Sequence, residues 1–239
     1  MPFTLNDVVP WGRSYDEYVR MFALDEAELR LRILGCADGP ASFNAEATRR
    51  GMQVISSDPL YAFGATAVRE RIDATSPDVL DQTRKNAAAF VWNTISSVED
   101  LGIIRKAAMA TFLEDYDPES RERASARRYV AAALPDLPFP DAAFDLALCS
   151  HFLFLYSDHL GADFHSDAVR ELCRVAREVR IFPLLSLDGE PSPFVETVRK
   201  TFTASGMVVS LELVPYEFQR GGNQMMRIRR RGSAGWGRG

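Results

Sequence analysis

The sequence has few cysteines, no long apolar run and no excess of positive charge. Its 239 residues include three cysteines, an odd number too widely spaced for a disulfide framework or a metal motif. No apolar stretch approaches the roughly 18 residues that a membrane helix needs, and the N-terminus lacks a secretory pattern. The net charge of -5 does not indicate a basic surface of the kind that binds nucleic acid. We therefore expect a cytoplasmic protein with no nucleic-acid or membrane partner.

What is present is the composition of an ordinary globular protein, 46% hydrophobic and 26% charged. A chain of this length can bury a full core as one large domain. We expect a single domain over residues 1–230, either a monomer or a homodimer, followed by a flexible tail at 231–239. Ser14 and Glu17 form a capping-box pattern, as do Asp25 and Glu28, so residues 1–28 are predicted to be a helical cap.

The most informative stretch runs from Leu31 to Pro40. It is typical of a buried strand over residues 31–35 that turns through a loop with glycines at 35 and 39 into a helix, with Pro40 in the first turn. Gly51 ends that helix, and a second strand over residues 52–57 leads to Asp58. This order of elements predicts a βαβ unit with parallel strands and a right-handed crossover.

Residues 62–128 interrupt the alternation of strands and helices. Apolar residues recur there at helical spacing, and Pro77 and Pro118 punctuate the segment. It is too long for one crossover helix, so we predict three or more helices. The segment is also long enough to form a lid that selects a substrate. Its aromatic residues are expected mainly to pack helix against helix.

Strand patterns resume at 128–133, 144–150 and 179–185, with helices over 163–176 and from Ser192 to Gly206. Two final strands, 207–214 and 224–228, are predicted to form a hairpin joined through Gly221 and Gly222. The pattern indicates an α/β fold: a doubly wound, mostly parallel seven-stranded sheet that ends in an antiparallel hairpin, with a helical insertion after strand two.

The loop at 35–40 suits a ligand that has a ribose and a charged tail. Asp58, at the end of strand two, can accept hydrogen bonds from both ribose hydroxyls. Dinucleotide folds use Gly-x-Gly-x-x-Gly, but counting from Gly35 places Ala37 at the second glycine and Pro40 at the third. The nicotinamide fingerprint is therefore broken. The wider Gly35-to-Gly39 spacing can wrap a more compact ligand near the helix N-terminus.

Two stretches of the chain resemble the class I S-adenosylmethionine-dependent methyltransferases. One is Ile33-Leu34-Gly35-Cys36-Ala37-Asp38-Gly39 together with Asp58, and the other runs from Leu137-Pro138-Phe139-Pro140-Asp141 through Phe144-Asp145-Leu146 to His151. The resemblance implies a methyltransferase that uses S-adenosylmethionine and acts on a small-molecule acceptor. It also implies a cofactor site at these residues: Gly35, Cys36, Ala37, Gly39, Asp58, Pro59, Ala133, Leu134 and Ser150.

The chain departs from the family pattern at three places. Ile33 and Ala133 replace acidic residues that often contact the cofactor, and Ala37 replaces the middle glycine. Asp38, within the loop, is our candidate to replace the missing acid at the methionine ammonium.

His151 follows strand four, where the family binds its methyl acceptor. A histidine there can remove a proton from a hydroxyl or ammonium acceptor, so we name His151 as the candidate catalytic base. His159 and His165 lie downstream, but their spacing does not place both on one helical face, and we predict no metal site. In the N-terminal segment, Trp11, Arg13, Tyr15 and Tyr18 either close over the cofactor or pack in the core.

Two other functions stay open from the sequence. A nicotinamide-dependent oxidoreductase would use the same strand-loop-helix unit, although Pro40 disfavours it. An inactive S-adenosylmethionine-binding protein that serves as a partner or sensor would fit the missing acids at Ile33 and Ala133. The acceptor and its reacting atom cannot be deduced from these residues.

Overall fold

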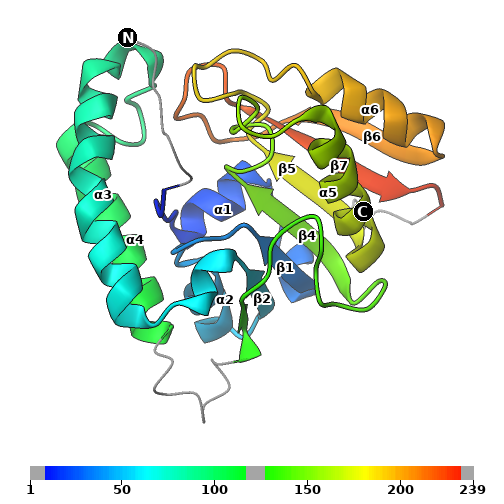
Figure 1. Cartoon of the computed structure of the whole chain (residues 1–239), viewed down its shortest axis with the longest axis horizontal. Helices are drawn as coiled ribbons and strands as arrows, with labels where there is room; N and C mark the ends of the chain where they lie inside the picture. The colour runs from blue at the N-terminus through cyan, green and yellow to red at the C-terminus, as the bar shows by residue number, and fades with distance from the viewer. Residues whose placement is uncertain (1–8, 117–126, 233–239) are drawn as a thin grey trace.

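The chain folds around a seven-stranded sheet with strand order β3-β2-β1-β4-β5-β7-β6 (Figure 1). The computed structural model describes residues 9–116 and 127–232. The strands are parallel except β7, which runs antiparallel to β5 and β6. The predicted fold class is confirmed. The strands are β1 (Arg32–Cys36), β2 (Gln53–Ser57), β3 (Tyr129–Val130), β4 (Phe144–Ser150), β5 (Ala176–Phe182), β6 (Met207–Leu213) and β7 (Gln224–Arg230).

Helices cover both faces of this sheet and one side of the molecule. The α-helices are α1 (Tyr15–Met21), α2 (Phe43–Arg49), α3 (Ala65–Lys85), α4 (Val98–Asp115), α5 (Ala162–Val175) and α6 (Val195–Ala204). Short 3₁₀ turns are η1 (Glu28–Arg30), η2 (Pro59–Ala62) and η3 (Ala87–Ala89). Both predicted capping pairs form: Ser14 with Glu17 at α1, and Asp25 with Glu28 at η1.

The central strands are apolar on both sides because each side meets a layer of helices. Along β1, Ile33 packs with α1 and α2, whereas the next residue, Leu34, packs with α5 and α6. Side chains of β4 alternate between the same two cores, with Leu146 and Leu148 on one side and Ala147 on the other. This alternation of apolar residues explains the continuous hydrophobic run of β4.

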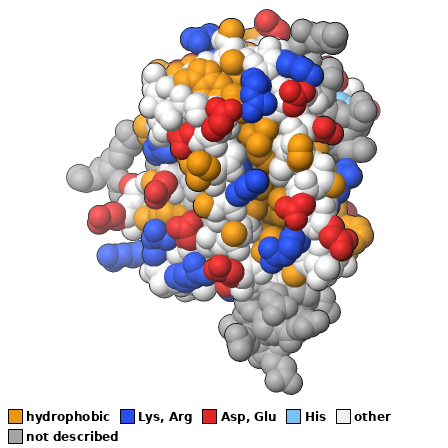
Figure 2. Space-filling view, turned by 90° about the vertical axis from the view of Figure 1, so that its left-hand side faces the viewer, with side chains coloured by type: hydrophobic (Ala, Val, Ile, Leu, Met, Phe, Trp, Pro, Cys, Tyr) orange, Lys and Arg blue, Asp and Glu red, His pale blue; other side chains and the backbone are white. Residues whose placement is uncertain are grey.

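The insertion forms a pair of long helices at one side of the sheet. Figure 1 shows α3 and α4 side by side at the left of the molecule. In the described part of residues 62–128, the helices after η2 are α3, η3 and α4. Figure 2 shows the molecule from the left-hand side of Figure 1, and on this face acidic and basic side chains are mixed with apolar ones. Pro118, part of the tail and part of the cap lie outside the described residues.

The expectation that Pro77 interrupts the helical segment was wrong, because Pro77 lies inside α3. A proline there removes one backbone donor from the helix. Nearby hydroxyls bind carbonyls of the preceding turn: Thr75 Oγ1 donates to the Arg71 carbonyl at 2.8 Å, and Ser76 Oγ donates to the Ile72 carbonyl at 2.6 Å. Side-chain donors thus bind carbonyl groups next to the position where the proline removes an N–H group.

Other boundaries also differ from the predictions: β5 lies three residues before the predicted 179–185, and α6 begins at Val195 and not at Ser192. The helix after the first loop starts at Phe43, so Pro40 belongs to the loop and not to the first turn. The strand predicted over 128–133 is paired only at Tyr129–Val130. This strand, β3, lies at the edge of the sheet, where β2 is its one neighbour. The final two strands do pair, but residues 214–223 connect them, which is longer than a two-residue turn through Gly221 and Gly222.

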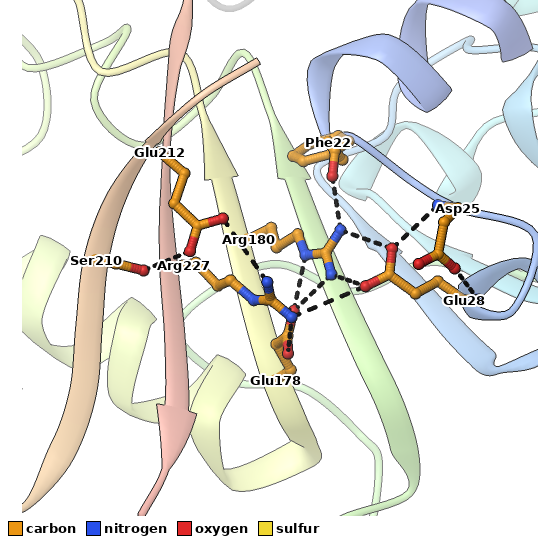
Figure 3. Close-up of polar contacts among 8 residues, drawn as sticks. All are labelled: Phe22, Asp25, Glu28, Glu178, Arg180, Ser210, Glu212 and Arg227. Carbon is orange, nitrogen blue, oxygen red and sulfur yellow. Dashed lines mark hydrogen bonds and ion pairs between the residues drawn. The ribbon is translucent and has the colours of Figure 1, made fainter. Parts of the chain in front are cut away.

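Buried charges tie the N-terminal segment to the C-terminal strands (Figure 3). Arg180 of β5, only 2% exposed, pairs with Glu28 and donates from Nη1 to the carbonyl of Phe22 at 2.6 Å. Its Nε donates to Glu178, which also accepts from Arg227 of β7 at 2.9 Å. Such buried charges persist only when each is paired, so this cluster fixes the position of the cap against the sheet.

A second buried ion pair joins the cap to the insertion. Glu17 of α1 accepts two hydrogen bonds from the guanidinium of Arg105 of α4, one of them at 2.7 Å. The Tyr216 hydroxyl also donates to Glu17 at 2.8 Å. Arg105 is completely buried, and its charge and hydrogen bonds help to hold the pKa of the Glu17 carboxyl at about 2, against the effect of burial. Elements from three parts of the chain therefore meet at one carboxylate.

We predict that removing either partner of this pair is strongly destabilising. Glu17→Gln or Arg105→Met leaves a buried charge without a partner, and each is expected to lower the free energy of unfolding by about 3–5 kcal/mol. Urea unfolding measures this change. Arg84→Ala, which removes an exposed ion pair between α3 and α4, serves as the control and should leave stability unchanged. A loss in the double variant equal to the sum of the single losses would show that the two charges are not coupled.

Candidate active site

A large cavity lies at the carboxyl ends of the parallel strands, with a volume of about 620 Å³. This edge of an open α/β sheet is where such folds bind ligands. The structure brings nearly all the predicted site residues to its wall: Cys36, Ala37, Gly39, Asp58, Pro59, Ala133, Leu134, Ser150 and His151. Gly35 is the exception among the predicted residues.

Gly35 lies behind the wall, where it makes room for Asp38. A Cβ atom at Gly35 would lie 2.1 Å from Asp38 Oδ2, so a larger residue fits only if this carboxylate moves away from its hydrogen-bond partners. The carboxylate of Asp38 accepts hydrogen bonds from the Tyr18 hydroxyl at 2.6 Å and from Ser56 Oγ at 2.5 Å. Burial raises the pKa of Asp38 to about 6, although both hydrogen bonds oppose this shift. Asp38 is a buried carboxylate on the cavity wall whose hydrogen bonds come from neutral hydroxyls.

Asp58 holds the loop in place from the neighbouring strand. Its Oδ2 accepts the backbone N–H of Gly39 at 2.9 Å, and its Oδ1 accepts the N–H of Leu60 at 2.8 Å. The Tyr61 hydroxyl donates to the Gly39 carbonyl at 2.8 Å. Asp58 thus caps η2 and also orders the loop, and its remaining lone pairs are at the cavity wall. The sequence predicted the position of Asp58 but not these roles of Leu60 and Tyr61.

The loop backbone is left-handed at two residues. Gly39 has φ of +52°, and Ala37 has φ of +54°. Glycine adopts this conformation without steric cost, whereas alanine does not. Ala37 occupies the place of the middle glycine in the family pattern, and its N–H donates to the Ser57 carbonyl at 2.8 Å. The conformation of the loop is therefore kept although the glycine is absent.

His151 lies on the cavity wall directly after β4. Its backbone is also left-handed, with φ of +52°, and its N–H donates to the Phe182 carbonyl at 2.7 Å. The ring atom Nδ1 lies 2.9 Å from Ser150 Oγ. Burial, followed by the charges of Arg13 and Arg105, lowers the pKa of His151 well below 6.5. The imidazole is therefore neutral at pH 7.

The N-terminal segment closes one side of the cavity. Trp11, Arg13 and Tyr18 line it, whereas Tyr15 stacks on Phe43 in the core. The segment packs closely, since a Cβ at Gly12 would lie 2.0 Å from the Pro40 carbonyl oxygen. Three of the four residues proposed to cover the cofactor therefore lie at the cavity, and one belongs to the core.

The prediction that the aromatic residues of the insertion mainly pack helix against helix is confirmed at Phe112 and Tyr116, whereas Phe63 and Phe90 line the cavity. Met109, Phe112 and Tyr116 form a buried cluster with Tyr61 and Tyr129. Phe90 differs, since it lines the cavity and stacks on Phe218 at 4.8 Å between ring centroids. Nothing in the sequence around Phe90 indicates that this residue lies beside the C-terminal loop.

Of the two histidines downstream of His151, His165 is held inside the fold by hydrogen bonds and ring contacts. Both ring nitrogens of the buried His165 lie 2.9 Å from carbonyl oxygens, those of Gly161 and Leu153. Its ring packs between Phe154 and Phe194. Within residues 9–116 and 127–232 no group of three or more His, Cys, Asp or Glu side chains is arranged to hold a metal ion. In the same part of the chain, no helix is long and apolar enough to cross a membrane.

Comparison with known proteins agrees with this architecture. Residues 101–179 match the family model described as "Methyltransferase domain". The protein named Uncharacterized protein MJ0045, from Methanocaldococcus jannaschii, is 35% identical over 230 residues, which cover 95% of this chain and 98% of that protein. The match to the family model includes β4, which ends at the cavity.

Solved structures show more distant likenesses. Magnesium protoporphyrin IX methyltransferase from Synechocystis PCC 6803, with bound S-adenosylmethionine, is 12% identical, with a TM-score of 0.43 over 84% of this chain and 70% of that one. An O-methyltransferase family protein from Burkholderia thailandensis is 14% identical, with a TM-score of 0.47 over 92% of this chain and 56% of that one. Likenesses this distant do not specify an acceptor.

The sheet order and the methyltransferase-domain match over residues 101–179 confirm the predicted resemblance to the class I S-adenosylmethionine-dependent methyltransferases. The chain belongs to one family with the Methanocaldococcus jannaschii protein MJ0045.

The buried state of Asp38 predicts a pH dependence of stability. The folded pKa of about 6 lies above the ordinary value of 3.8 for an aspartate, so the folded protein holds this proton more tightly than the unfolded chain. The resulting stabilisation is complete below pH 4 and is lost as the pH rises through 6, by about 3 kcal/mol. Urea unfolding of wild type and Asp38→Asn between pH 4 and 7 measures it. Equal pH slopes in the two proteins would contradict a raised pKa at Asp38.

Proposed function

We propose that the protein transfers a methyl group from S-adenosylmethionine to a small-molecule acceptor bound in the same cavity. The observation that carries this proposal is one cavity that extends from the loop at residues 36–40 to His151 and on to α3. Its volume of about 620 Å³ lies within the range of small-molecule sites. Such an enclosed, largely apolar space suits a small acceptor better than a nucleic acid or a protein surface.

The residues of the loop fit this cofactor. S-adenosylmethionine has a positively charged sulfur and an ammonium group, and Asp38 is a carboxylate whose desolvation a nearby cation would offset. Asp58 can accept from ribose hydroxyls while it holds Gly39 and Leu60. Ala133 and Leu134 line the side of the cavity next to Asp58 and β3 and would contact the adenine. The left-handed Gly39 lets the backbone pass beside the ligand without a Cβ.

When bound, the cofactor would supply a methyl group on a sulfur that leaves as a neutral thioether. The leaving group therefore needs no acid from the protein. What the residues of this chain must do is orient the acceptor, exclude water and remove a proton from a hydroxyl or ammonium acceptor. His151 suits the last task because its imidazole is neutral at pH 7. If Nδ1 donates to Ser150 Oγ, the lone pair is left on Nε2, where a base needs it.

We also place the protein in a reducing compartment such as the cytoplasm. Cys36, Cys149 and Cys173 are free thiols, and all three are buried. Burial raises the pKa of each, to about 12 for Cys149 and Cys173, so the reactive thiolate is scarce at pH 7.

Calorimetry tests the cofactor site. We expect S-adenosylmethionine and S-adenosylhomocysteine both to bind, and Asp58→Ala to weaken each by about 1–3 kcal/mol, the value of a charge-assisted hydrogen bond. Asp58→Asn, which keeps an acceptor for one backbone N–H, should lose less. Asp73→Asn on the exposed side of α3 is the control. Undiminished binding by Asp58→Ala would remove this site from the proposal, and binding of NAD(H) instead would favour an oxidoreductase.

A second experiment isolates His151. We expect His151→Asn, which tolerates the left-handed backbone, to bind S-adenosylhomocysteine as wild type does, since the imidazole serves the acceptor. With an acceptor whose reacting group carries a proton, kcat should fall by about 10²–10⁴-fold, the usual contribution of a general base. NMR titration of the wild-type imidazole should give a pKa below 6.5. A protonated imidazole at pH 7 would exclude His151 as the base.

A further inference from the structure

The charged residues on the cavity wall are separated by sign. The two acidic residues, Asp38 and Asp58, both belong to the loop region proposed to hold the cofactor, and both already accept two hydrogen bonds. The basic residues on the described wall are Arg13 from the N-terminal segment and Arg71 from α3. The wall also carries Ser150 beside His151 and several apolar or aromatic residues, among them Phe152, Leu155 and Phe218. The acceptor space therefore has positive charge and no acidic side chain among its described residues.

Arg13 has a donor that nothing in the described structure satisfies. Its Nη1 donates to the Trp11 carbonyl at 2.6 Å, but its Nε is buried without a hydrogen-bond partner. A buried donor without a partner is costly, and more so when it carries charge. Burial and the nearby Arg105 together lower the pKa of Arg13 to about 10. This guanidinium is therefore placed where an anion would stabilise it.

The nearest acidic group is already occupied by other partners. Glu17 accepts from Arg105, Tyr216 and Ser14, which leaves it committed to the pair that joins α1 to α4. Arg13 is not among the main groups that shift the pKa of Asp38 or of Asp58. The charge of Arg13 acts on the pKa of His151 and of Tyr156, which both follow β4, as well as on that of Tyr18. Arg13 and His151 both line the cavity, so an anion bound by Arg13 would lie in the same space as the candidate base.

We propose that the methyl acceptor is an apolar molecule with one anionic group, such as a carboxylate, and that Arg13 binds this group. This inference rests on the proposed function, because it assigns the acceptor space of the same cavity. A guanidinium suits the role because its planar fork donates two parallel hydrogen bonds to a carboxylate. The apolar wall would take the rest of the acceptor, and the fixed anion would direct its reacting group toward His151.

The test compares two ligands of nearly the same size and shape, one anionic and one neutral. Binding of 2-naphthoate and of the neutral 2-naphthamide is measured by calorimetry on the full chain saturated with S-adenosylhomocysteine. We expect naphthoate to bind about tenfold more tightly, the difference that one charge-assisted hydrogen-bond pair makes. Arg13→Gln should abolish this preference but leave naphthamide binding intact, which also shows that the variant is folded. Arg13→Lys should keep part of the preference, and Arg69→Gln, on the exposed surface of α3, should keep all of it.

The outcomes distinguish a failure of the anionic-acceptor proposal from a failure of the proposed function. Equal binding of the two naphthalene ligands by wild type would overturn the anionic acceptor, whether or not S-adenosylhomocysteine binds. If Arg13→Gln instead weakens S-adenosylhomocysteine and leaves the naphthoate preference unchanged, Arg13 binds the carboxylate of the cofactor, and the proposal for the acceptor fails. A protein that binds no S-adenosylhomocysteine contradicts the proposed function. In that case the naphthoate comparison without cofactor still reports whether Arg13 binds an anion.

Discussion

The contact between the Asp38 carboxylate and the Cα of Gly35 is the constraint on which the site depends. A larger residue at position 35 would push the carboxylate aside, because its Cβ would overlap the carboxylate where it now lies. The carboxylate in turn joins three segments, since Tyr18 comes from α1, Ser56 from β2 and Asp38 from the loop. The loop is thus shaped from behind by a buried acid, while Asp58 fixes it from the side through Gly39.

This arrangement explains how a chain that departs from the family pattern can keep the shape of the site. Ile33 stands where the family often has an acid, and it is fully buried against α1 and α2. A carboxylate is nevertheless present at the cavity, supplied by Asp38 within the loop. Ala37 likewise adopts the left-handed backbone of the missing glycine. The geometry therefore fits replacement of the missing acid and glycine within the same loop better than it fits loss of the site.

The succession of strands and helices along the chain and the ligand-binding edge could be predicted because they depend on local patterns: apolar runs, glycines and a carboxylate at a strand end. The bounds of β4 were predicted correctly for this reason. What the sequence could not show are contacts between distant segments. Arg105 and Glu17 are 88 positions apart, and neither has a local signal of pairing. Pro77 shows the opposite error, because a local rule predicted an interruption whereas α3 continues through Pro77, with buried side chains on both sides of it at Ile72 and Val79.

The cluster around Arg180 bears on how a ligand enters. This guanidinium binds both the carbonyl of Phe22, at the end of α1, and the carboxylate of Glu28. Glu17 fixes the start of the same helix to α4 through Arg105. With both ends held by buried charges, α1 cannot swing outward without exposing or unpairing them. Entry of a ligand therefore does not depend on an outward movement of α1, so that the route in and the anchor of the cap are separate parts of the molecule.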